Sequence, residues 1–448
     1  MEAHERYKRL LKKTFIDYNQ TAKIIEKPLI FPKAEGLYQW DLEGKKYFDA
    51  IGGIFVAVLG HRHPRVVEAV KKQLDKTTFS PSLHGVSDVG LELVDKLGSI
   101  SPGDLNFVKG FCGGSESIEA AMKLSRQYFK QTGRGSKYKF ISNYLSYHGG
   151  TFAAMAASGN ANRKINFEPQ MGGFIKMLSP MQLRDKFASW AQTCAFTAQM
   201  FEDVIINENP DTVAGIVIEP ICNTGGIITP TQEYFQIIRD LCDKYDVMLI
   251  FDEVLTGFGK TGAMFAADAY QVVPDIICSG KSLTSGVVPG GAIMAHEHYA
   301  DAFYGDLGRE FAHGHSYANN PMTSAAGIAV IDVLTEEKLP EKAERLGAYL
   351  ENKLNGLNSL GIIKEIRGKG VLRGVELVSD QLTGKKAKEG LKLGNVLKQT
   401  AIDNGLIMRI DPDWFAVCPP LIANEPDIDE LVSLIEKSLK DALSILSE

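Results

Sequence analysis

Lys281 is the side chain in this sequence best suited to covalent chemistry. It closely follows a short apolar segment, residues 276–278, and is itself followed by Ser282 and Leu283. Burial at the end of a strand removes water from a lysine ammonium and lowers its pKa from about 10.4. The resulting neutral amine is a nucleophile that forms Schiff bases with aldehydes. A surface lysine at the start of a loop is the alternative, so the rest of the sequence must decide.

Two carboxylates follow similar apolar segments. Asp252 follows residues 247–251, and Glu219 follows residues 216–218. Ligands of open α/β sheets bind at the carboxyl ends of the strands, so we expect Lys281, Asp252 and Glu219 to share one crevice. Each carboxylate has an ordinary alternative, as a helix cap or as a loop residue. The three together favour a catalytic site.

A glycine pair opens a predicted helix and offers a place for an anion. Gly113, Gly114 and Ser115 precede a helical pattern of apolar residues. Glycines let an anion approach the backbone, and the N-terminus of a helix presents free N–H groups. An ordinary capped helix start remains the alternative. Tyr147, which follows a predicted strand, could stack on a planar cofactor or belong to the core, and His148 beside it could be a plain loop residue.

The surrounding elements alternate between strands and helices. Residues 213–218 and 247–251 are continuous apolar runs, typical of parallel strands buried on both faces. Residues 232–245 form a helical pattern between them, which predicts a βαβ unit. Residues 38–48 are typical of a hairpin with its turn at Glu43-Gly44, and residues 428–446 of an amphipathic helix.

Composition narrows the function classes. The chain has 448 residues, a formal net charge of −6 and six scattered cysteines. No basic block indicates nucleic acid as a partner, and the cysteines favour a reducing cytoplasm over a disulfide framework. The charged N-terminus argues against a signal peptide, and no apolar run approaches the roughly 20 residues needed to cross a membrane.

Nucleotide and metal sites are poorly supported. A P-loop ending at Lys281 or Lys260 would need glycine where Asp275 or Val254 stands. His313 and His315 have no carboxylate or cysteine partner at a convincing spacing. We therefore expect no metal.

With these residues in hand, the chain resembles the class III (omega) aminotransferases of pyridoxal-phosphate (PLP) fold type I, in particular those acting on omega-amino acids or amines with pyruvate. The match runs from about residue 36 to residue 434, and the stretch 251–262 is its most specific part. The motifs that carry the resemblance are Gly60-His61-Arg62-His63-Pro64, Gly113-Gly114-Ser115-Glu116-Ser117, Tyr147-His148-Gly149, Glu219-Pro220, Phe251-Asp252-Glu253-Val254-Leu255-Thr256-Gly257-Phe258-Gly259-Lys260-Thr261-Gly262 and Ser279-Gly280-Lys281.

The resemblance implies a fold, a cofactor and an assembly. It implies a large α/β domain, residues 66–330, with a mostly parallel seven-stranded sheet between helices. Residues 1–65 and 331–448 would form a smaller α+β domain from both chain ends. The cofactor would be PLP, and the protein would be a homodimer, or a dimer of dimers, with shared active sites. The substrates would be an amine or amino acid and a keto acid.

The resemblance also implies roles for individual residues. Lys281 would be the Schiff-base lysine, and Asp252 would keep the cofactor pyridine nitrogen protonated. Val254 and Tyr147 would cover the two faces of the ring. Glu219 would lie on the side of the ring hydroxyl. His148 would belong to the same cofactor site.

The phosphate would be bound by Gly113, Gly114, Ser115 and Ser316, the last from a loop that crosses to the neighbouring subunit. Two of these positions depart from the family pattern: Gly113 stands where serine is usual, and Ser316 where threonine is usual.

The substrate side is less well defined. Glu425 stands where some family members have an arginine that grips a substrate carboxylate. Recognition of a carboxylate would then come from Arg163 or Arg409. Phe55 would line the substrate pocket beside Tyr147, or be a plain core residue.

The sequence leaves the reaction partly open. The first hypothesis is transamination of a terminal amine with pyruvate or 2-oxoglutarate as acceptor. A decarboxylase or aminomutase on the same fold is the alternative, and a protein without catalytic activity is a distant third. The sequence identifies neither the amine nor the acceptor.

Overall fold

The centre of the protein is a seven-stranded sheet. The computed structural model describes residues 2–380, 385–386 and 393–447. The strands of the sheet are β4 (Phe107–Phe111), β5 (Lys139–Asn143), β6 (Phe174–Met177), β7 (Val213–Ile218), β8 (Met248–Asp252), β9 (Ile276–Ser279) and β10 (Gly291–Ala295). Their order is β4-β10-β9-β8-β7-β5-β6. Strand β10 runs antiparallel to both of its neighbours, β4 and β9, and the other pairs are parallel, so the sheet is mostly parallel, as expected.

The predicted βαβ unit is confirmed. Helix α10 (Gln232–Tyr245) lies between β7 and β8, which pair in parallel. The Thr231 side chain accepts a hydrogen bond from the Tyr234 backbone N–H at the start of α10, and Asp246 ends the helix in a left-handed conformation. Every residue of β7 and of β8 is buried. The strands read as continuous apolar runs because both faces of the sheet are covered.

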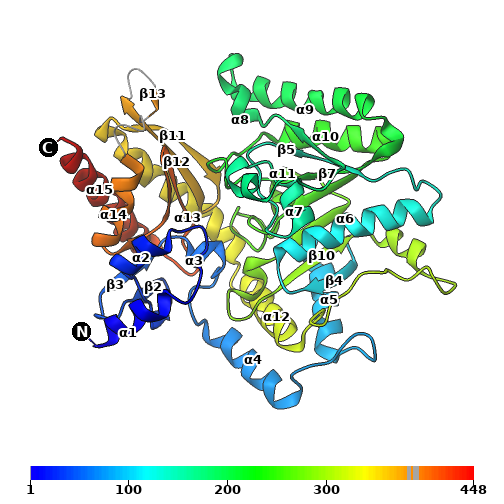
Figure 1. The fold of residues 1–448 in the computed structure, drawn as a ribbon, viewed down its shortest axis with the longest axis horizontal. Helices are drawn as coiled ribbons and strands as arrows, with labels where there is room; N and C mark the ends of the chain where they lie inside the picture. Colours follow the sequence, from blue (N-terminus) through cyan, green and yellow to red (C-terminus); the bar gives the residue numbers. More distant parts are fainter. Residues whose placement is uncertain (1, 381–384, 387–392, 448) are drawn as a thin grey trace.

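Two apolar clusters cover the sheet, one on each face. Within β7, Ile216 belongs to one cluster and Val217 to the other. Leu249 and Ile250 of β8 divide in the same way. Successive side chains of a strand point to opposite faces, which explains this alternation. The layers of helices around the sheet are visible in Figure 1.

Further helices lie along the whole described chain. They are α1 (Glu2–Leu11), α2 (Thr21–Glu26), α3 (Gly52–Phe55), α4 (Pro64–Lys76), α5 (Asp88–Ile100), α6 (Gly114–Gln131), α7 (Phe152–Ala157), α8 (Pro180–Leu183), α9 (Trp190–Asn207), α11 (Ala266–Tyr270), α12 (Pro321–Glu336), α13 (Leu339–Asn355), α14 (Leu393–Asp403) and α15 (Glu425–Ser447). The amphipathic helix expected at residues 428–446 is therefore α15.

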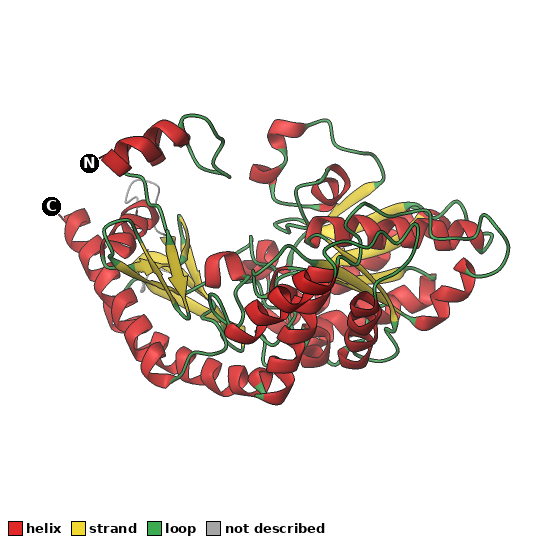
Figure 2. Ribbon diagram, turned by 90° about the horizontal axis from the view of Figure 1, so that it is seen from below, coloured by secondary structure: helices red, strands yellow, loops and turns green. Residues whose placement is uncertain are grey.

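Both chain ends contribute to a second group of strands. Its strands are β1 (Lys33–Glu35), β2 (Tyr38–Trp40), β3 (Lys46–Asp49), β11 (Ile363–Lys369), β12 (Leu372–Asp380), β13 (Lys385–Lys386), β14 (Leu406–Ile407), β15 (Arg409–Asp411) and β16 (Trp414–Val417). The predicted hairpin is β2 paired with β3, and its turn includes Gly44 at a φ of 80°. Strand β14 then pairs with β3 in parallel, which joins the two ends of the chain. Figure 2 shows these strands apart from the large sheet.

The domain limits after residue 65 and after residue 330 stay predictions. Helix α4 begins at Pro64, and α12 continues across residue 330. The two groups of strands, however, fall on the expected sides of these limits.

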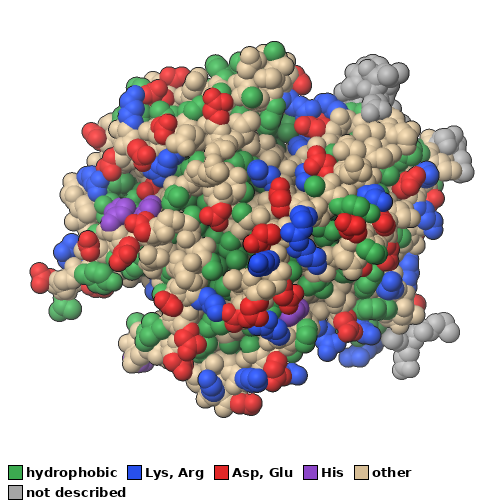
Figure 3. Space-filling model, turned by 180° about the vertical axis from the view of Figure 1, so that it is seen from behind, with side chains coloured by type: hydrophobic (Ala, Val, Ile, Leu, Met, Phe, Trp, Pro, Cys, Tyr) green, Lys and Arg blue, Asp and Glu red, His purple; other side chains and the backbone are tan. Residues whose placement is uncertain are grey.

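The surface carries charges of both signs. In the view of Figure 3, Lys and Arg side chains lie interspersed with Asp and Glu side chains. Among the described helices, none combines the length and the apolar character that a membrane span requires.

Candidate active site

The three strand ends singled out in the sequence open into one pocket of about 200 Å³. Glu219 follows β7, Asp252 ends β8, and Lys281 lies two residues after β9. The lining residues are Gly114, Ser115, Tyr147, His148, Gly149, Glu219, Asn223, Asp252, Val254, Leu255 and Lys281. An amine, two carboxylates and a helix N-terminus therefore share one cavity.

The backbone of Lys281 is held in an unfavourable conformation. Its φ is 38°, in the left-handed region that non-glycine residues rarely adopt. The neighbouring Ser282 anchors the segment, because its Oγ accepts a hydrogen bond from the buried Lys260 and donates one to the Phe55 carbonyl. Burial lowers the pKa of Lys281, although the charges of Asp252 and Glu219 oppose this shift. The side chain is thus biased toward a neutral amine.

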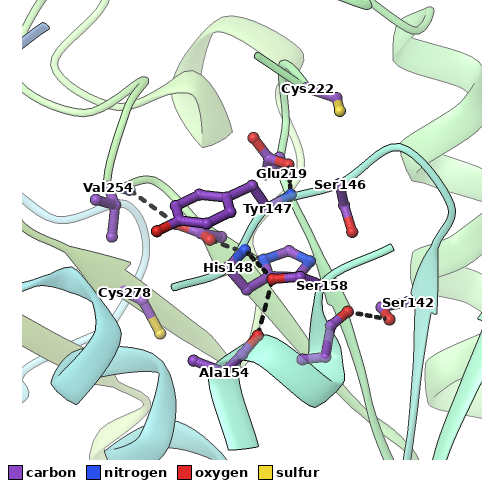
Figure 4. A network of polar contacts seen from close by, with 12 residues as sticks. Ser142, Ser146, Tyr147, His148, Ala154, Ser158, Glu219, Cys222, Val254 and Cys278 are labelled. Atoms are coloured by element: carbon purple, nitrogen blue, oxygen red, sulfur yellow. Dashed lines mark hydrogen bonds and ion pairs between the residues drawn. The ribbon is translucent and has the colours of Figure 1, made fainter. Parts of the chain in front are cut away.

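Asp252 is oriented by two hydrogen bonds. Its Oδ2 lies 2.8 Å from Nδ1 of His148, and its Oδ1 accepts from the Val254 backbone N–H at 3.1 Å. The His148 backbone N–H donates to Oγ of Ser158. The His148 Nε2 is buried and has no protein partner among the described residues. Figure 4 shows Tyr147, His148, Glu219 and Val254 gathered at this point.

Glu219 holds two loops that border the pocket. Its Oε1 accepts from the Tyr147 backbone N–H at 2.8 Å, and its Oε2 accepts from the Asn223 backbone N–H at 3.2 Å. Burial raises the pKa of Glu219, and the neighbouring His148 opposes that shift. Glu219 is therefore a structural link between the Tyr147 loop and the Asn223 loop as well as a polar group of the cavity.

The glycines at the other end of the pocket leave room that side chains would fill. Gly114 is the first residue of α6, and a Cβ there would lie 2.6 Å from Cγ1 of Val254. Gly149 has a φ of 146°, and a Cβ there would lie 2.4 Å from Oγ of Ser115. The Gly150 backbone N–H donates to that same Oγ. The free N–H groups at the start of α6 therefore face a site suited to an anion.

Five of the predicted site residues do not line this pocket. Gly113 precedes α6 as its N-cap, and Phe55 is 2% exposed in the core. The guanidinium of Arg163 lies 3.7 Å from the ring centroid of Tyr18 and 5.9 Å from that of Tyr147. Arg409 lies over Trp414, and its charge contributes to the lowered pKa of Lys281.

Ser316, the fifth, lies in the segment between β10 and α12 and does not line the pocket of its own chain. Glu425 is the first residue of α15 and is likewise absent from the lining.

Sequence reasoning missed three residues at the site. Leu255 and Asn223 line the pocket, and Tyr18 places its hydroxyl 3.3 Å from that of Tyr147. Leu255 lies within the specific stretch 251–262, and Asn223 between Pro220 and the glycine pair 225–226, so both had a local signal. Tyr18 had no local signal, because it lies 129 positions before its contact, Tyr147.

The surroundings of His315 correct one expectation. Its Nδ1 lies 3.9 Å from Sγ of Cys112, and its Nε2 lies 3.5 Å from Oε2 of Glu116. A cysteine and a carboxylate are therefore close to His315 in space, although no sequence spacing revealed them. The absence of a metal stays a prediction.

Comparison with known proteins agrees with this architecture. The family model for aminotransferase class-III matches residues 20–439. A probable aminotransferase of Mycobacterium tuberculosis is 35% identical over 429 residues, which cover 93% of this chain and 90% of that protein.

Solved structures give the same result. An (S)-enantioselective omega-transaminase from Thermomicrobium roseum superposes with a TM-score of 0.94 at 32% identity, covering 98% of this chain and 99% of that one. A PLP-bound amine transaminase from an uncultivated Pseudomonas species gives a TM-score of 0.90 at 28% identity, covering 96% and 98%.

The fold and the site define a PLP-dependent enzyme that transfers amino groups. The chain belongs to the class III aminotransferase family. The residues present fit the cofactor: a buried amine, a carboxylate held by His148, and a glycine-lined helix start stand around one cavity.

Proposed function

We propose that this aminotransferase moves the amino group of a terminal amine or omega-amino acid to a keto acid such as pyruvate or 2-oxoglutarate. The observation that carries the proposal is the convergence of Lys281, Asp252 and Glu219 on one pocket. The match to an omega-transaminase over nearly the whole chain supports the choice of a terminal amine. The identity of the amine is left to experiment.

Lys281 is the group we assign to covalent and proton-transfer chemistry. Bound PLP supplies the electron-accepting ring on which transamination depends. A buried lysine with a lowered pKa offers a neutral amine, which would hold the cofactor aldehyde and would serve as the base at the substrate carbon. Burial also excludes bulk water, which protects the proton from exchange during transfer.

Asp252 is assigned to the cofactor pyridine nitrogen. A carboxylate at that nitrogen favours its protonated form, which the ring needs to accept electrons. His148 is assigned to the positioning of Asp252, since Nδ1 of the imidazole lies 2.8 Å from Oδ2 of the carboxylate. Tyr147 and Val254 are assigned to the two faces of the ring, and Glu219 to its hydroxyl side.

The start of α6 is assigned to the phosphate. Gly114 and Ser115 line the pocket there, with Gly113 preceding them. Ser316 is assigned to the phosphate of a neighbouring subunit, in a homodimer with shared active sites. Light scattering of the purified holoenzyme tests the dimer: a monomeric, fully active enzyme would contradict shared sites.

Substrate carboxylates are assigned to Arg163 or Arg409, the two cations proposed from the sequence. Arg163 stacks on Tyr18 beside the Tyr147 hydroxyl, and the charge of Arg409 reaches Lys281. Phe55 is assigned to the pocket only through its backbone carbonyl, which accepts a hydrogen bond from Oγ of Ser282, the residue after Lys281. The expected compartment is the cytoplasm, which fractionation of the source cells would test.

Replacement of Lys281 by alanine tests the proposal. The variant is expected to lose transaminase activity by roughly 10²–10⁴-fold and to lack the visible absorbance of the lysine-bound cofactor. Lys130→Ala, on the exposed side of α6, is the matched control and keeps both properties. A Lys281→Ala enzyme with the wild-type rate would refute the assignment. Product analysis with an amine donor separates transamination from decarboxylation or amino migration.

A further inference from the structure

A second cavity, larger than the catalytic pocket, lies between the two groups of strands. Its volume is about 440 Å³. One wall comes from the segment between α8 and α9, and the other from β11, β12 and α13. None of its lining residues belongs to the catalytic pocket. The cavity is therefore a separate space that the transamination mechanism does not use.

Three arginines line this cavity and keep unused hydrogen-bond donors. Arg184 and Arg367 each place Nη1 2.7 Å from Oε2 of Glu376, and the same two Nη1 atoms lie 3.3 and 2.8 Å from Oε2 of Glu365. Nη1 of Arg373 lies 2.9 Å from Oε2 of Glu351. In the described part of the chain, the Nη2 group of none of the three has a hydrogen-bond acceptor. Arg373 is 7% exposed, and its Nε also has no partner there. Guanidinium groups with free N–H donors match the geometry of a carboxylate.

Apolar side chains complete the wall. Phe187 and Trp190 line the same cavity, together with Met181 and Ile366. Pockets that recognise small organic ligands combine such apolar surface with a few placed polar groups. The combination fits a ligand with a carboxylate at one end and an apolar, planar body at the other.

The cavity is connected to the catalytic pocket by the loop 222–229. The Arg367 Nε donates to the Gly226 carbonyl at 2.7 Å, and the Trp190 Nε1 donates to the Thr229 carbonyl at 3.0 Å. The same loop carries Asn223, which lines the catalytic pocket and donates its backbone N–H to Glu219. Two residues of the second cavity thus hold the loop that borders the first.

We propose that the cavity bounded by Arg184, Arg367, Arg373, Phe187 and Trp190 binds a small aromatic carboxylate, and that its occupancy alters catalysis through the loop 222–229. The ligand carboxylate accepts from the free guanidinium N–H groups, and its ring packs on Phe187 and Trp190. A bound ligand restrains Arg367 and Trp190, and through them the position of Asn223 relative to Glu219. This regulatory site goes beyond the transamination reaction.

Phenylacetate is the probe, titrated into the PLP-loaded enzyme. Calorimetry measures its binding, Trp fluorescence reports on Trp190, and the visible absorbance of the cofactor reports on the catalytic pocket. We expect binding that changes Trp fluorescence and causes at most a small change in the cofactor spectrum, because the ligand does not itself enter the catalytic pocket. Arg373→Met should weaken that binding roughly tenfold or more, because it removes the least neutralised guanidinium. Arg345→Met, exposed on α13, is the matched control and should bind as the wild type does.

A second variant tests the proposal independently, in case Arg373→Met does not fold. Phe187 is partly exposed, so we expect Phe187→Asp to fold, and it replaces the apolar surface under the ligand ring by a negative charge. It should weaken phenylacetate binding to a similar degree while the visible spectrum of the cofactor stays normal. Phenylacetate should also change kcat or KM of the wild type and not of Phe187→Asp. Unchanged binding in both variants, or binding seen only as a change in the cofactor spectrum, would overturn the proposal.

Discussion

Nδ1 of His148 lies 2.8 Å from Oδ2 of Asp252, and both side chains are buried. A buried carboxylate needs hydrogen-bond partners, and His148 and the Val254 N–H supply them to Asp252. The other imidazole nitrogen has no protein partner in the described part of the chain. We therefore propose that His148 is a positioning residue whose effect on the reaction passes through Asp252.

Replacement of Asp252 by asparagine is expected to reduce kcat by roughly 10- to 100-fold or more, because a neutral amide does not stabilise a protonated pyridine ring. Stopped-flow measurement of the half-reaction with an amine checks this. His148→Gln should give a smaller loss, since it disturbs the carboxylate without removing it. Asp246→Asn, an exposed aspartate at the end of α10, is the control. Equal rates for Asp252→Asn and the wild type would exclude the assigned role.

Alanine at position 149 is expected to weaken cofactor binding by roughly 10- to 100-fold through overpacking against Oγ of Ser115. The positive φ of Gly149 adds strain. Gly150→Ala is a matched neighbour, because its Cβ would meet only the Tyr147 hydroxyl, at 3.9 Å. Equilibrium titration of the apoenzyme with PLP compares them. Similar affinities for the two variants would show that the space beside Ser115 is not needed by the cofactor.

Arg163→Met and Arg409→Met separate the two candidate sites for a substrate carboxylate. The variant that removes the carboxylate partner should raise KM for the keto acid roughly tenfold or more, since a bidentate ion pair is lost. The same variant should leave KM for an amine without a carboxylate close to the wild-type value. Steady-state kinetics with both substrates makes the distinction. If KM for the keto acid rises in neither variant, both arginines are excluded as partners of the substrate carboxylate.

Glu253 should make stability fall as pH rises. Burial raises its pKa to about 7 from an ordinary value of 4.5, so between these values the folded protein holds a proton that the unfolded chain has lost. Stability from this group is present below the unfolded pKa and is lost as pH rises through about 7. Glu253→Gln removes the effect.

Chemical denaturation of the wild type and of Glu253→Gln at pH 5 and pH 8 measures this loss of stability. The free energy of unfolding of Glu253→Gln minus that of the wild type should be larger at pH 8 than at pH 5, by on the order of 1–3 kcal/mol. Glu376→Gln is the contrast, because its arginine partners hold the pKa of Glu376 at about 2. The difference in free energy of unfolding between Glu376→Gln and the wild type should change little between pH 5 and pH 8. A constant difference for Glu253→Gln would contradict the raised pKa.

Local pattern alone determined most of the catalytic framework. Apolar runs buried on both faces of a sheet define strands whatever else surrounds them, so the positions of Glu219 after β7 and of Asp252 at the end of β8 could be predicted from the sequence. The glycines before α6 and the hairpin turn at Gly44 carry their own conformational signal. The resemblance to class III aminotransferases then assigned Lys281 its role.

Tertiary packing alone decided the contacts that tune and connect the site. His148 and Asp252 are separated by 104 positions, Tyr18 and Tyr147 by 129, and Arg367 and Gly226 by 141. No periodicity or motif relates such pairs, because their distances depend on how whole elements pack. For the same reason Cys112 beside His315 and the cavity around Arg373 became visible only in the folded chain.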